Sequence, residues 1–534
     1  MSTTTVDEQQ RQTIEQQYGP LGPHSVELID GVIVSADDGF ELKGVLALPA
    51  GGDKVPAVLI RSPYDPASFR PEVAAFYMGE VIAWASHGYA CLVQTTRTTT
   101  SYFDEAADGS ATVRWMEKQP WFDGRLGLTG ASYHAFSSWA TASTRPASLK
   151  AIATAMYSTD RVSSWYPGGG FALELALSWT AIQQANGAEV GENPYNHLPL
   201  NQADVAATGT TLDFYQERLV HDGEDPHWQA LNFAELLDDP PAPILHIDGW
   251  YDYHRNYFWH DFERLSRNTG DVPYRFVIGP WPHAVLDPRI SMAEKLAWFD
   301  TYVRGDGTDR FGTLRYHRTG VDAGWHELDK WHEPETTVFY ASSDGQLLTG
   351  RSELAERVEW TYDPADPTPS VGFLTIGTGD VSGLWDSGAL EQRADVRVFT
   401  SPPLREPLDL AGHASAATTF YSDAPSADLF LRVLDVYENG QVQNIADGIL
   451  RVTDPGLGEG VPVEVDLGPI GHHFAAGHRL RLVLASGAHP YYNRNLGNGE
   501  PTATATRIRV AHQAVAVGGE DGLRITLPLA PLRS

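Results

Sequence analysis

Residues Leu126–Ala135 read LGLTGASYHA, and a helix-compatible segment, Phe136–Thr144, follows at once. The apolar run ends in Gly130, Ala131 and Ser132. Small residues allow the chain to bend tightly here, and a strand that turns sharply into a helix lifts its turn serine above the edge of the sheet. A Gly-x-Ser turn alone is common in proteins. The pattern therefore predicts a nucleophile at Ser132 only if a base and an acid accompany it.

Two later apolar runs end in suitable partners. A nucleophilic serine needs a base to take its proton and an acid to orient that base. The run PILHIDGWYD ends at Asp252, and the run YRFVIGPWPH ends at His283. Carboxyl ends of parallel strands meet at one edge of a sheet, so the three side chains are predicted to converge. The order Ser132, Asp252, His283 is that of α/β hydrolases.

The bulk composition is that of a globular protein with more than one domain. The 534 residues exceed what one hydrophobic core supports, so two or three domains are expected. Apolar residues make up 42% and charged residues 20% of the chain. The formal net charge of −31 argues against nucleic acid and anionic membranes as partners, and is interpreted as an acidic surface that keeps the protein soluble.

Few features of the sequence indicate a cellular compartment. The single cysteine, Cys91, cannot form an internal disulfide and lies in a buried-strand pattern, so it is interpreted as a small core residue. The first ten residues lack an apolar core like that of a signal peptide, and no apolar run approaches the ~18 residues of a membrane span. These features predict a cytoplasmic protein without membrane contact.

The first half of the chain alternates strand and helix patterns. Residues 1–24 are interpreted as an N-terminal arm outside the core, with one short helix at Asp7–Gln17. Residues 25–156 begin with a β-hairpin and continue with the βαβ rhythm of a parallel sheet. This rhythm resumes at residues 242–334, where a helix is expected at Ile290–Val303.

Two further regions differ in their pattern of predicted helices and strands. Residues 157–241 interrupt the sheet and are predicted to be an inserted helical cap, with helices at Phe171–Gln184 and Asp204–Leu219. Residues 335–534 are predicted to be a β sandwich or jelly roll of short strands, one of them at Thr506–Val510.

Several short motifs recur in one known family. They are Arg61-Ser62-Pro63-Tyr64, Gln119-Pro120-Trp121-Phe122-Asp123-Gly124, Gly130-Ala131-Ser132-Tyr133, Gly249-Trp250-Tyr251-Asp252, Gly279-Pro280-Trp281-Pro282-His283, Asp447-Gly448-Ile449-Leu450-Arg451, Gly477-His478-Arg479-Leu480-Arg481 and Asn493-Arg494-Asn495. With these motifs the chain, from about residue 26 to its end, resembles the X-prolyl dipeptidyl aminopeptidase and cocaine esterase superfamily of serine hydrolases.

The resemblance implies an α/β-hydrolase core, an inserted helical cap and a C-terminal jelly roll of the galactose-binding-like type. It also implies that Ser132 is the nucleophile, His283 the base and Asp252 the orienting acid. In the family an oxyanion hole combines a tyrosine hydroxyl with the backbone N–H that follows the nucleophile. These groups correspond here to Tyr64 and the amide of Tyr133.

The sequence departs from the family pattern at two places near the predicted site. Where relatives carry glycine after the serine, this chain has His134 and Ala135, and His134 is expected to alter the turn or reach the pocket. The segment Thr95–Ser101 replaces an acid and a glycine of the family, which predicts an unusual loop. Since no carboxylate occurs at residues 253–255, hydrolysis of amino-acid esters and release of dipeptides are discounted.

Other chemistry-bearing residues have plainer interpretations. Asp248 is an alternative triad acid. Asp252 is favoured because it fits the family pattern and is expected to be the more exposed of the two. Histidines at 254, 260, 472, 473 and 478 lack partners at metal-ligand spacing and are interpreted as structural. Among the aromatic residues, Trp250, Tyr253 and Trp281 are candidates to line an apolar substrate pocket with His134.

The sequence analysis predicts a serine esterase that forms an acyl-enzyme on a small-molecule ester or amide, without metal or cofactor. Three alternatives stay open: transfer of the acyl group to an amine or alcohol by an acyltransferase or cyclase, a peptidase or amidase activity, and a non-catalytic binding protein. The natural substrate and homo-oligomer formation are not determined by the sequence.

Overall fold

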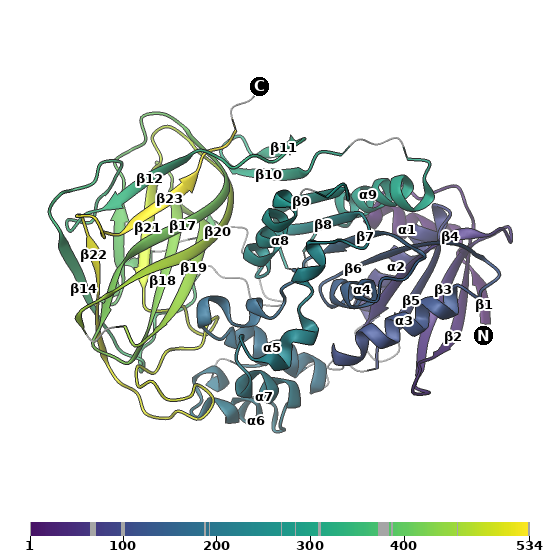
Figure 1. The fold of residues 1–534 in the computed structure, drawn as a ribbon, viewed down its shortest axis with the longest axis horizontal. Helices are drawn as coiled ribbons and strands as arrows, with labels where there is room; N and C mark the ends of the chain where they lie inside the picture. Colours follow the sequence, from purple (N-terminus) through teal and green to yellow (C-terminus); the bar gives the residue numbers. More distant parts are fainter. Residues whose placement is uncertain are drawn as a thin grey trace.

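A computed structural model describes most of the chain. The described residues are 2–64, 71–97, 102–185, 188–191, 193–268, 270–283, 285–307, 311–371, 384–385, 388–455 and 458–531. Figure 1 shows an α/β unit at one end, a β unit at the other, and a group of helices between them.

The α/β unit is built on one sheet that is parallel at its centre. Its spatial order is β1 (Ser2–Thr5), β2 (Val26–Ser35), β3 (Glu41–Pro49), β5 (Ala90–Thr95), β4 (Val55–Ser62), β6 (Phe122–Ala131), β7 (Leu149–Ala155), β8 (Ile244–Tyr251), β9 (Tyr274–Pro282), β10 (Leu314–Gly320) and β11 (Gly324–Leu328). Strands β5 to β10 are mutually parallel, whereas the strands beyond them pair antiparallel. The parallel centre agrees with the predicted βαβ rhythm.

Helices cover both faces of this sheet, because the central strands are apolar on both sides. In β4, Val58 and Ile60 belong to the core under one group of helices, and Ala57 and Leu59 belong to the core on the opposite face. The first group is α1 (Glu8–Tyr18), α2 (Pro71–Ser86) and α9 (Pro288–Phe299), and the second is α3 (Glu105–Met116), α4 (Tyr133–Ser143) and α8 (Arg255–Arg267). A π-helical turn at Asp300–Arg304 completes the helix predicted at Ile290–Val303.

The N-terminal arm packs onto the core and extends its sheet, which corrects the interpretation of residues 1–24 as an arm outside the core. Strand β1 pairs with β2 and extends the sheet, and the buried side chains of Val6, Ile14 and Tyr18 join the core on the α2 and α9 face. Helix α1 begins with a capping box between Asp7 and Gln10. The polar composition led to the wrong prediction because only one stripe of this helix is apolar.

The stretch between β7 and β8 is helical, as predicted, and lies between the α/β unit and the β unit (Figure 1). Its longer helices are α5 (Leu173–Gln184), α6 (Ala203–Thr208) and α7 (Asp213–Val220). The single helix predicted at Asp204–Leu219 is wrong, because Gly209 ends α6 in the left-handed region with φ +76°. The Asp204 carboxylate then accepts the Leu212 amide at 2.9 Å and starts the second helix.

The β unit has two facing sheets that share an apolar core. In one sheet β17 (Leu408–Ser422) pairs with β20 (Val461–Phe474), β22 (Ala511–Val517) and β23 (Arg524–Pro528), and these continue to β12 (Thr336–Ala341), β13 (Leu347–Leu348) and β14 (Glu356–Tyr362). The other sheet has the order β15 (Leu384–Trp385), β19 (Val442–Thr453), β18 (Ser426–Val436), β21 (Arg479–Ala485) and β16 (Arg397–Thr400). A short helix, α10 (Gly388–Glu391), precedes β16.

Several β-unit strands differ from the prediction. The predicted strand Thr506–Val510 is an exposed loop, and the strand begins at Ala511 instead. Strands β17 and β20 are longer than the predicted short runs because they cross the whole sheet. Apolar alternation identifies the buried part of a strand, but not the length over which a neighbour supplies hydrogen bonds.

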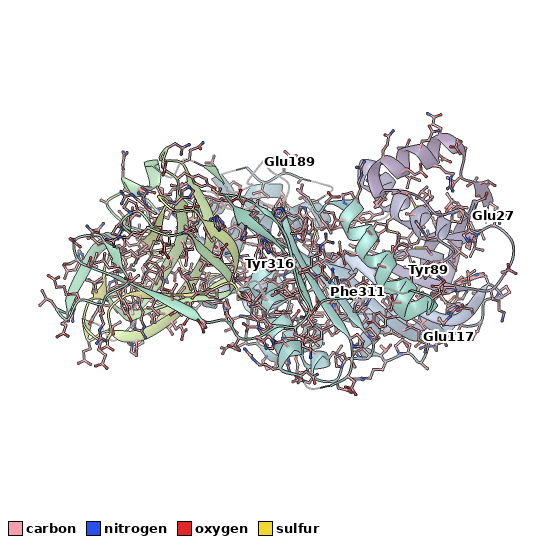
Figure 2. The ribbon with its side chains drawn as sticks, turned by 90° about the horizontal axis from the view of Figure 1, so that it is seen from above. Glu27, Tyr89, Glu117, Glu189, Phe311 and Tyr316 are labelled. Atoms are coloured by element: carbon pink, nitrogen blue, oxygen red, sulfur yellow. The ribbon has the colours of Figure 1, made fainter. Side chains whose placement is uncertain are left out.

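The α/β and β units are joined by backbone and side-chain contacts. The end of β10 pairs in parallel with β20, and seen from above Tyr316 of β10 lies near the junction (Figure 2). Arg255 of α8 forms an ion pair with Asp447 of β19 at 3.1 Å. In the described part of the chain, no helix is both apolar enough and long enough to cross a bilayer.

Candidate active site

Ser132 lies at the sharp turn between β6 and α4. Its backbone has φ +57° and ψ −121°, a conformation that non-glycine residues rarely adopt. Residue 130 must be glycine, because a Cβ there would lie 2.3 Å from the Cβ of His134. The Ser132 amide donates to the Ala155 carbonyl of β7 at 2.9 Å, which holds the turn at the carboxyl edge of the sheet.

The structure brings Ser132, His283 and Asp252 together. His283 follows β9, and its Nε2 lies 3.0 Å from the Ser132 Oγ. Asp252 follows β8, and its Oδ2 lies 2.7 Å from His283 Nδ1. Because an ionised carboxylate only accepts hydrogen bonds, the proton of a neutral His283 lies on Nδ1 and Nε2 faces the serine as an acceptor. This arrangement can remove a proton from Ser132.

Asp252, and not Asp248, contacts His283. Burial raises the pKa of Asp248 well above its usual range, and the nearby Asp252 charge raises it further. Burial would also raise the pKa of Asp252, but the contacts with His283 and His254 outweigh it and lower the pKa. The Asp252 carboxylate also accepts the His254 amide at 2.8 Å. The pKa values of the two neighbouring acids thus shift in opposite directions, so Asp248 holds its proton more strongly than Asp252 does.

Tyr64 lies just beyond β4, among aromatic rings. Its ring stacks on Tyr77 at 5.9 Å and meets the His134 ring edge-on at 5.6 Å. Burial raises the pKa of Tyr64, while a hydrogen bond from the Trp179 indole and the Arg161 charge lower it. Because the indole only donates, the phenol oxygen is the acceptor and the phenol proton can point to another group.

Tyr133 is the first residue of α4, and its side chain and amide have different surroundings. The buried phenol donates to the Glu105 carboxylate at 3.0 Å. Its amide is in the first turn of the helix, where backbone N–H groups have no acceptor within the helix. Such an amide, directly after Ser132, can donate to an anion formed beside the serine.

Family models match both halves of the chain. A model of X-Pro dipeptidyl-peptidase (S15 family) matches residues 38–285, and a model of the X-Pro dipeptidyl-peptidase C-terminal non-catalytic domain matches residues 306–525. The chain is 28% identical to the cocaine esterase of Rhodococcus sp. (strain MB1 Bresler), over 93% of its length and 98% of that protein. The chain belongs to the X-Pro dipeptidyl-peptidase and cocaine esterase superfamily.

Membership makes the protein a serine hydrolase and confirms the family predicted from the motifs. Solved structures agree on the fold. An aminopeptidase from a marine sediment archaeon, Thaumarchaeota archaeon, has a TM-score of 0.80 at 20% identity, covering 96% of this chain and 97% of its own. An alpha-amino acid ester hydrolase has the same TM-score and identity, with 94% and 97% covered. The fold is α/β-hydrolase-like, with a C-terminal non-catalytic domain built mostly of strands.

Of the predicted pocket residues, only Tyr253 contacts the three converging side chains. Its hydroxyl lies 3.2 Å from His283 Nε2, on the nitrogen that faces Ser132. His134 is fully buried beneath the turn, with Nε2 3.0 Å from the Ser62 hydroxyl, and burial lowers its pKa to about 3. It therefore packs under Tyr64 as a neutral side chain.

Trp250 and Trp281 are structural in this superfamily member, and neither reaches the converging side chains. The Trp250 indole donates to the His317 carbonyl at 2.7 Å and packs against Gly471, where a Cβ would lie 2.3 Å from the ring. Trp281 is buried against Trp325, with ring centroids 5.7 Å apart. Trp250 belongs to the core under α3, α4 and α8, and Trp281 belongs to the core on the opposite face, under α1, α2 and α9.

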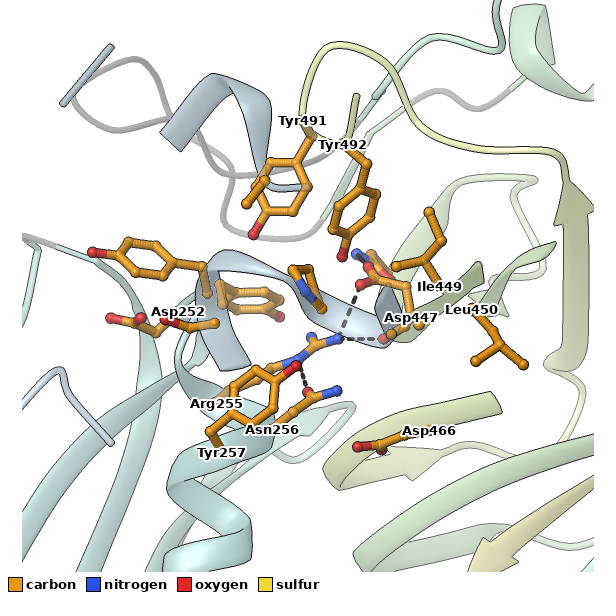
Figure 3. Close-up of a pocket in the computed structure, with 18 of the residues that line it drawn as sticks. Asp252, Arg255, Asn256, Tyr257, Asp447, Ile449, Leu450, Asp466, Tyr491 and Tyr492 are labelled. Atoms are coloured by element: carbon orange, nitrogen blue, oxygen red, sulfur yellow. Dashed lines mark hydrogen bonds and ion pairs between the residues drawn. The ribbon is translucent and has the colours of Figure 1, made fainter. Parts of the chain in front are cut away.

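A cavity of about 180 Å³ lies behind Asp252, between all three parts of the molecule (Figure 3). Its lining includes Tyr253, Pro167 of the helical region, and Tyr491 of the β unit. Dashed lines in Figure 3 join Arg255 to Asp447. Ser132 does not line this cavity, so the cavity is separate from the Ser132 hydroxyl.

The segment that replaces the family's Asp-x-Arg-Gly pattern is described only in part. Arg97 donates to both carboxylate oxygens of Asp108, at 2.8 and 2.7 Å, and pairs with Asp38. Thr95 donates to the Lys43 carbonyl at 3.0 Å. Residues 98–101 lie outside the described part of the chain. The loop is thus attached to the β2–β3 hairpin and α3 through Arg97.

Among the residues that the structure describes, two groups of side chains have ligand atoms close enough to hold a metal ion. One is Asp252, His254 and His283, which coincides with the site. The other joins His260 of α8 to His413 of β17 and Asp466 of β20. In the second group Asp466 accepts from His413 at 2.6 Å and pairs with His260 at 3.2 Å, so these side chains already satisfy one another as ion pairs.

This second group predicts a pH-dependent contribution to stability. Burial alone would lower the pKa of His413, but Asp466 and Glu263 raise it from 6.5 to about 10. The stabilisation is therefore complete below about pH 6.5 and is lost as the pH rises toward 10. His413→Gln is expected to lower Tm by about 1–3 °C at pH 6 and by less at pH 10.

Thermal unfolding of wild type and variant at both pH values measures this difference. His512→Gln is the control, because the His512 ring contacts the Thr361 hydroxyl at 3.2 Å. An equal Tm loss for His413→Gln at both pH values would contradict the ion-pair interpretation.

Sequence reasoning missed two residues beside the site. Trp179 of α5 donates to Tyr64, and Arg161 lies buried among aromatic rings near Tyr133. For Arg161 a signal existed, since it is the one cation in residues 157–165, a segment with an aromatic residue at each end, Tyr157 and Trp165. For Trp179 no local signal existed, because a tryptophan in an apolar helix is by default a core residue.

Proposed function

We propose that the protein hydrolyses carboxylic esters through an acyl-enzyme on Ser132. The observation that carries this proposal is the continuous chain from the Ser132 Oγ to His283 Nε2, 3.0 Å, and from His283 Nδ1 to Asp252 Oδ2, 2.7 Å. Ser132 Oγ attacks the ester carbonyl carbon while its proton passes to His283 Nε2. Asp252 stabilises the imidazolium that forms.

The oxyanion is stabilised by two donors, the Tyr64 hydroxyl and the Tyr133 amide. The indole N–H of Trp179 donates to the phenol oxygen of Tyr64, and the phenol O–H is the donor that we assign to the oxyanion. Burial keeps the pKa of Tyr64 raised, so the phenol stays protonated. Donors aimed where charge develops lower the barrier because they need no reorganisation during the reaction.

The remaining steps use the same groups. The imidazolium of His283 gives its proton to the alcohol oxygen as the carbon–oxygen bond breaks, and the acyl group stays on Ser132 Oγ. Water then attacks the acyl carbon and gives a proton to His283 Nε2. Collapse of this second intermediate returns the proton to Ser132 and releases the acid.

The other parts of the chain are assigned supporting roles. Residues 157–241 act as a helical cap that supplies Trp179 and Arg161 to the site, and residues 335–534 form a jelly-roll domain that supports the Asp252 turn through Arg255 and Asp447. The named activity of the cocaine esterase relative favours an ester over a peptide substrate.

Tyr64→Phe is expected to lower kcat/KM for an aryl ester by about 10²–10³-fold, because one oxyanion donor is lost. Steady-state kinetics with para-nitrophenyl esters measures this effect. Tyr302→Phe is the matched control, since Tyr302 packs against Trp298 on the α9 face. A rate for Tyr64→Phe equal to that of the control would remove Tyr64 from the oxyanion hole.

A fluorophosphonate probe with peptide mapping tests the nucleophile, and a panel of para-nitrophenyl esters tests the activity. Labelling at Ser132 with turnover of the esters is expected. Labelling without turnover unless an amine or alcohol is added would instead indicate acyl transfer. Absence of both labelling and turnover would indicate a non-catalytic protein.

A further inference from the structure

Arg161 is a buried cation beside the proposed site. It follows β7 and is only 6% exposed. Its guanidinium carbon lies 4.9 Å from the ring centroid of Tyr102, 5.8 Å from that of Tyr133, 5.5 Å from that of Phe136 and 5.4 Å from that of Trp165. Four aromatic faces therefore surround the charge, and one of them belongs to the residue that follows Ser132.

Hydrogen bonds satisfy only part of this guanidinium. Nη2 donates to the Tyr102 hydroxyl at 3.1 Å, while Nε and Nη1 are buried and have no hydrogen-bond partner among the described residues. Within the same residues, no carboxylate forms an ion pair with it. A buried charge with unmade hydrogen bonds is costly, and cation–π contacts offset only part of that cost.

The carboxylates near Arg161 bond to other groups. Glu105 pairs with Arg61 and accepts from Tyr133. Asp261 accepts from the Thr159 amide at 2.7 Å and from the Thr159 hydroxyl. Asp160 bonds to Ser163 and Asn232. Among the described residues, no carboxylate thus serves as a counterion of Arg161.

The charge of Arg161 extends to the reacting groups. It lowers the otherwise raised pKa values of Tyr64, Tyr133 and Tyr253, and it adds to the lowering of the pKa of His254. Tyr253 contacts His283 at 3.2 Å, and Tyr64 is the proposed oxyanion donor. The geometric link to Ser132 is Tyr133, which directly follows the serine and whose ring centroid lies 5.8 Å from the Arg161 guanidinium carbon.

Given the proposed ester hydrolysis, we propose that Arg161 binds a carboxylate of the substrate, so that the preferred substrates are esters that carry a second, anionic carboxyl group. The unpartnered Nε–H and Nη1–H groups lie on different edges of the planar guanidinium, so either of them can donate a charge-assisted hydrogen bond to a carboxylate oxygen. The same charge disfavours a substrate ammonium group, which agrees with the absence of carboxylates at residues 253–255. The net charge of −31 cannot attract such an anion from a distance, so recognition depends on this local contact.

Arg218 provides a matched comparison within the same aromatic cluster. It is also buried, and its guanidinium carbon lies 5.3 Å from the Trp165 ring that also faces Arg161. Arg218 differs because it donates to the Ala176 carbonyl at 2.8 Å, to the Phe214 carbonyl at 3.4 Å and to the Thr180 hydroxyl. Its hydrogen bonds are used within the protein.

The experiment compares paired esters that differ only in charge. Para-nitrophenyl hydrogen glutarate carries the carboxylate on the acyl side, and its methyl ester is the neutral partner. Para-acetoxybenzoate carries the carboxylate on the leaving group, and methyl para-acetoxybenzoate is its partner. For one of these pairs, wild type is expected to favour the anion by about 10- to 100-fold in kcat/KM, the range of a charge-assisted hydrogen-bonded contact.

Arg161→Gln is expected to abolish this ratio, whereas Arg218→Gln should retain it. The ratio is internal to each variant, so a merely structural role of Arg161 would not change it. Ratios near one for both pairs in wild type, or a ratio that Arg161→Gln leaves intact, would overturn the inference. Hydrolysis that persists in Ser132→Ala would instead overturn the proposed function. Because the wild-type ratio is measured without any variant, poor folding of Arg161→Gln does not prevent the test.

Discussion

Ser132→Ala is expected to lower kcat for an aryl ester by about 10⁶-fold, the scale seen when a serine nucleophile is removed from a complete triad. The reason is that alanine has no oxygen to attack the carbonyl. The 2.7 Å hydrogen bond between His283 Nδ1 and Asp252 Oδ2 is expected to persist in the variant. Alanine at φ +57° is no more strained than serine, so the turn is expected to persist.

Stopped-flow and steady-state hydrolysis of para-nitrophenyl esters measure this loss, with fluorophosphonate labelling as a second readout. Ser143→Ala is the matched control, because Ser143 lies at the other end of α4 and its hydroxyl donates to the Ala140 carbonyl at 2.7 Å. A Ser132→Ala variant within tenfold of this control would exclude Ser132 as the nucleophile.

Asp252→Asn is expected to lower kcat by about 10⁴-fold, because an amide in place of the carboxylate favours the wrong tautomer of His283. When the NH₂ group of the introduced amide donates to His283, Nδ1 becomes an acceptor and the proton moves to Nε2, the nitrogen that must accept from Ser132. Rates measured over a range of pH separate this loss from a simple shift in ionisation.

Asp248→Asn is the control for that variant. Asp248 is buried four residues earlier on the same strand, its Oδ1 accepts from the Gly249 amide at 2.7 Å, and burial raises its pKa. Since burial favours the neutral form of Asp248 and this carboxyl does not contact His283, replacement by a neutral amide is expected to cost less than about tenfold. A larger loss for Asp248→Asn than for Asp252→Asn would reverse their assigned roles.

The proximity of Ser132, Asp252 and His283 was predictable from local patterns. Each follows an apolar run that a parallel sheet buries on both faces, and parallel strands present their carboxyl ends at one edge. The tight Gly130–Ser132 turn requires a residue without a Cβ at its start, which is a purely local demand. Residue order and strand ends were therefore enough to place these three side chains near one another.

The surroundings of these side chains were not predictable in the same way. Candidates chosen by residue type alone included Trp250 and Trp281, which instead pack into the cores on the two faces of the sheet, against partners that are distant in the sequence. Similarly, the polar composition of residues 1–24 concealed Val6 and Ile14, which are buried only because α2 and α9 provide an apolar surface for them.

By itself, the sequence determined the alternation of strands and helices, the chain order of the three converging residues and the superfamily, because these depend on spacing and backbone demands within short segments. Only the tertiary structure decided which of two neighbouring acids holds its proton more strongly, which phenol receives the Trp179 hydrogen bond, and that Arg161 lies beside the site without a carboxylate partner among the described residues. Burial and charge proximity act between residues far apart in the chain, so no local pattern encodes them.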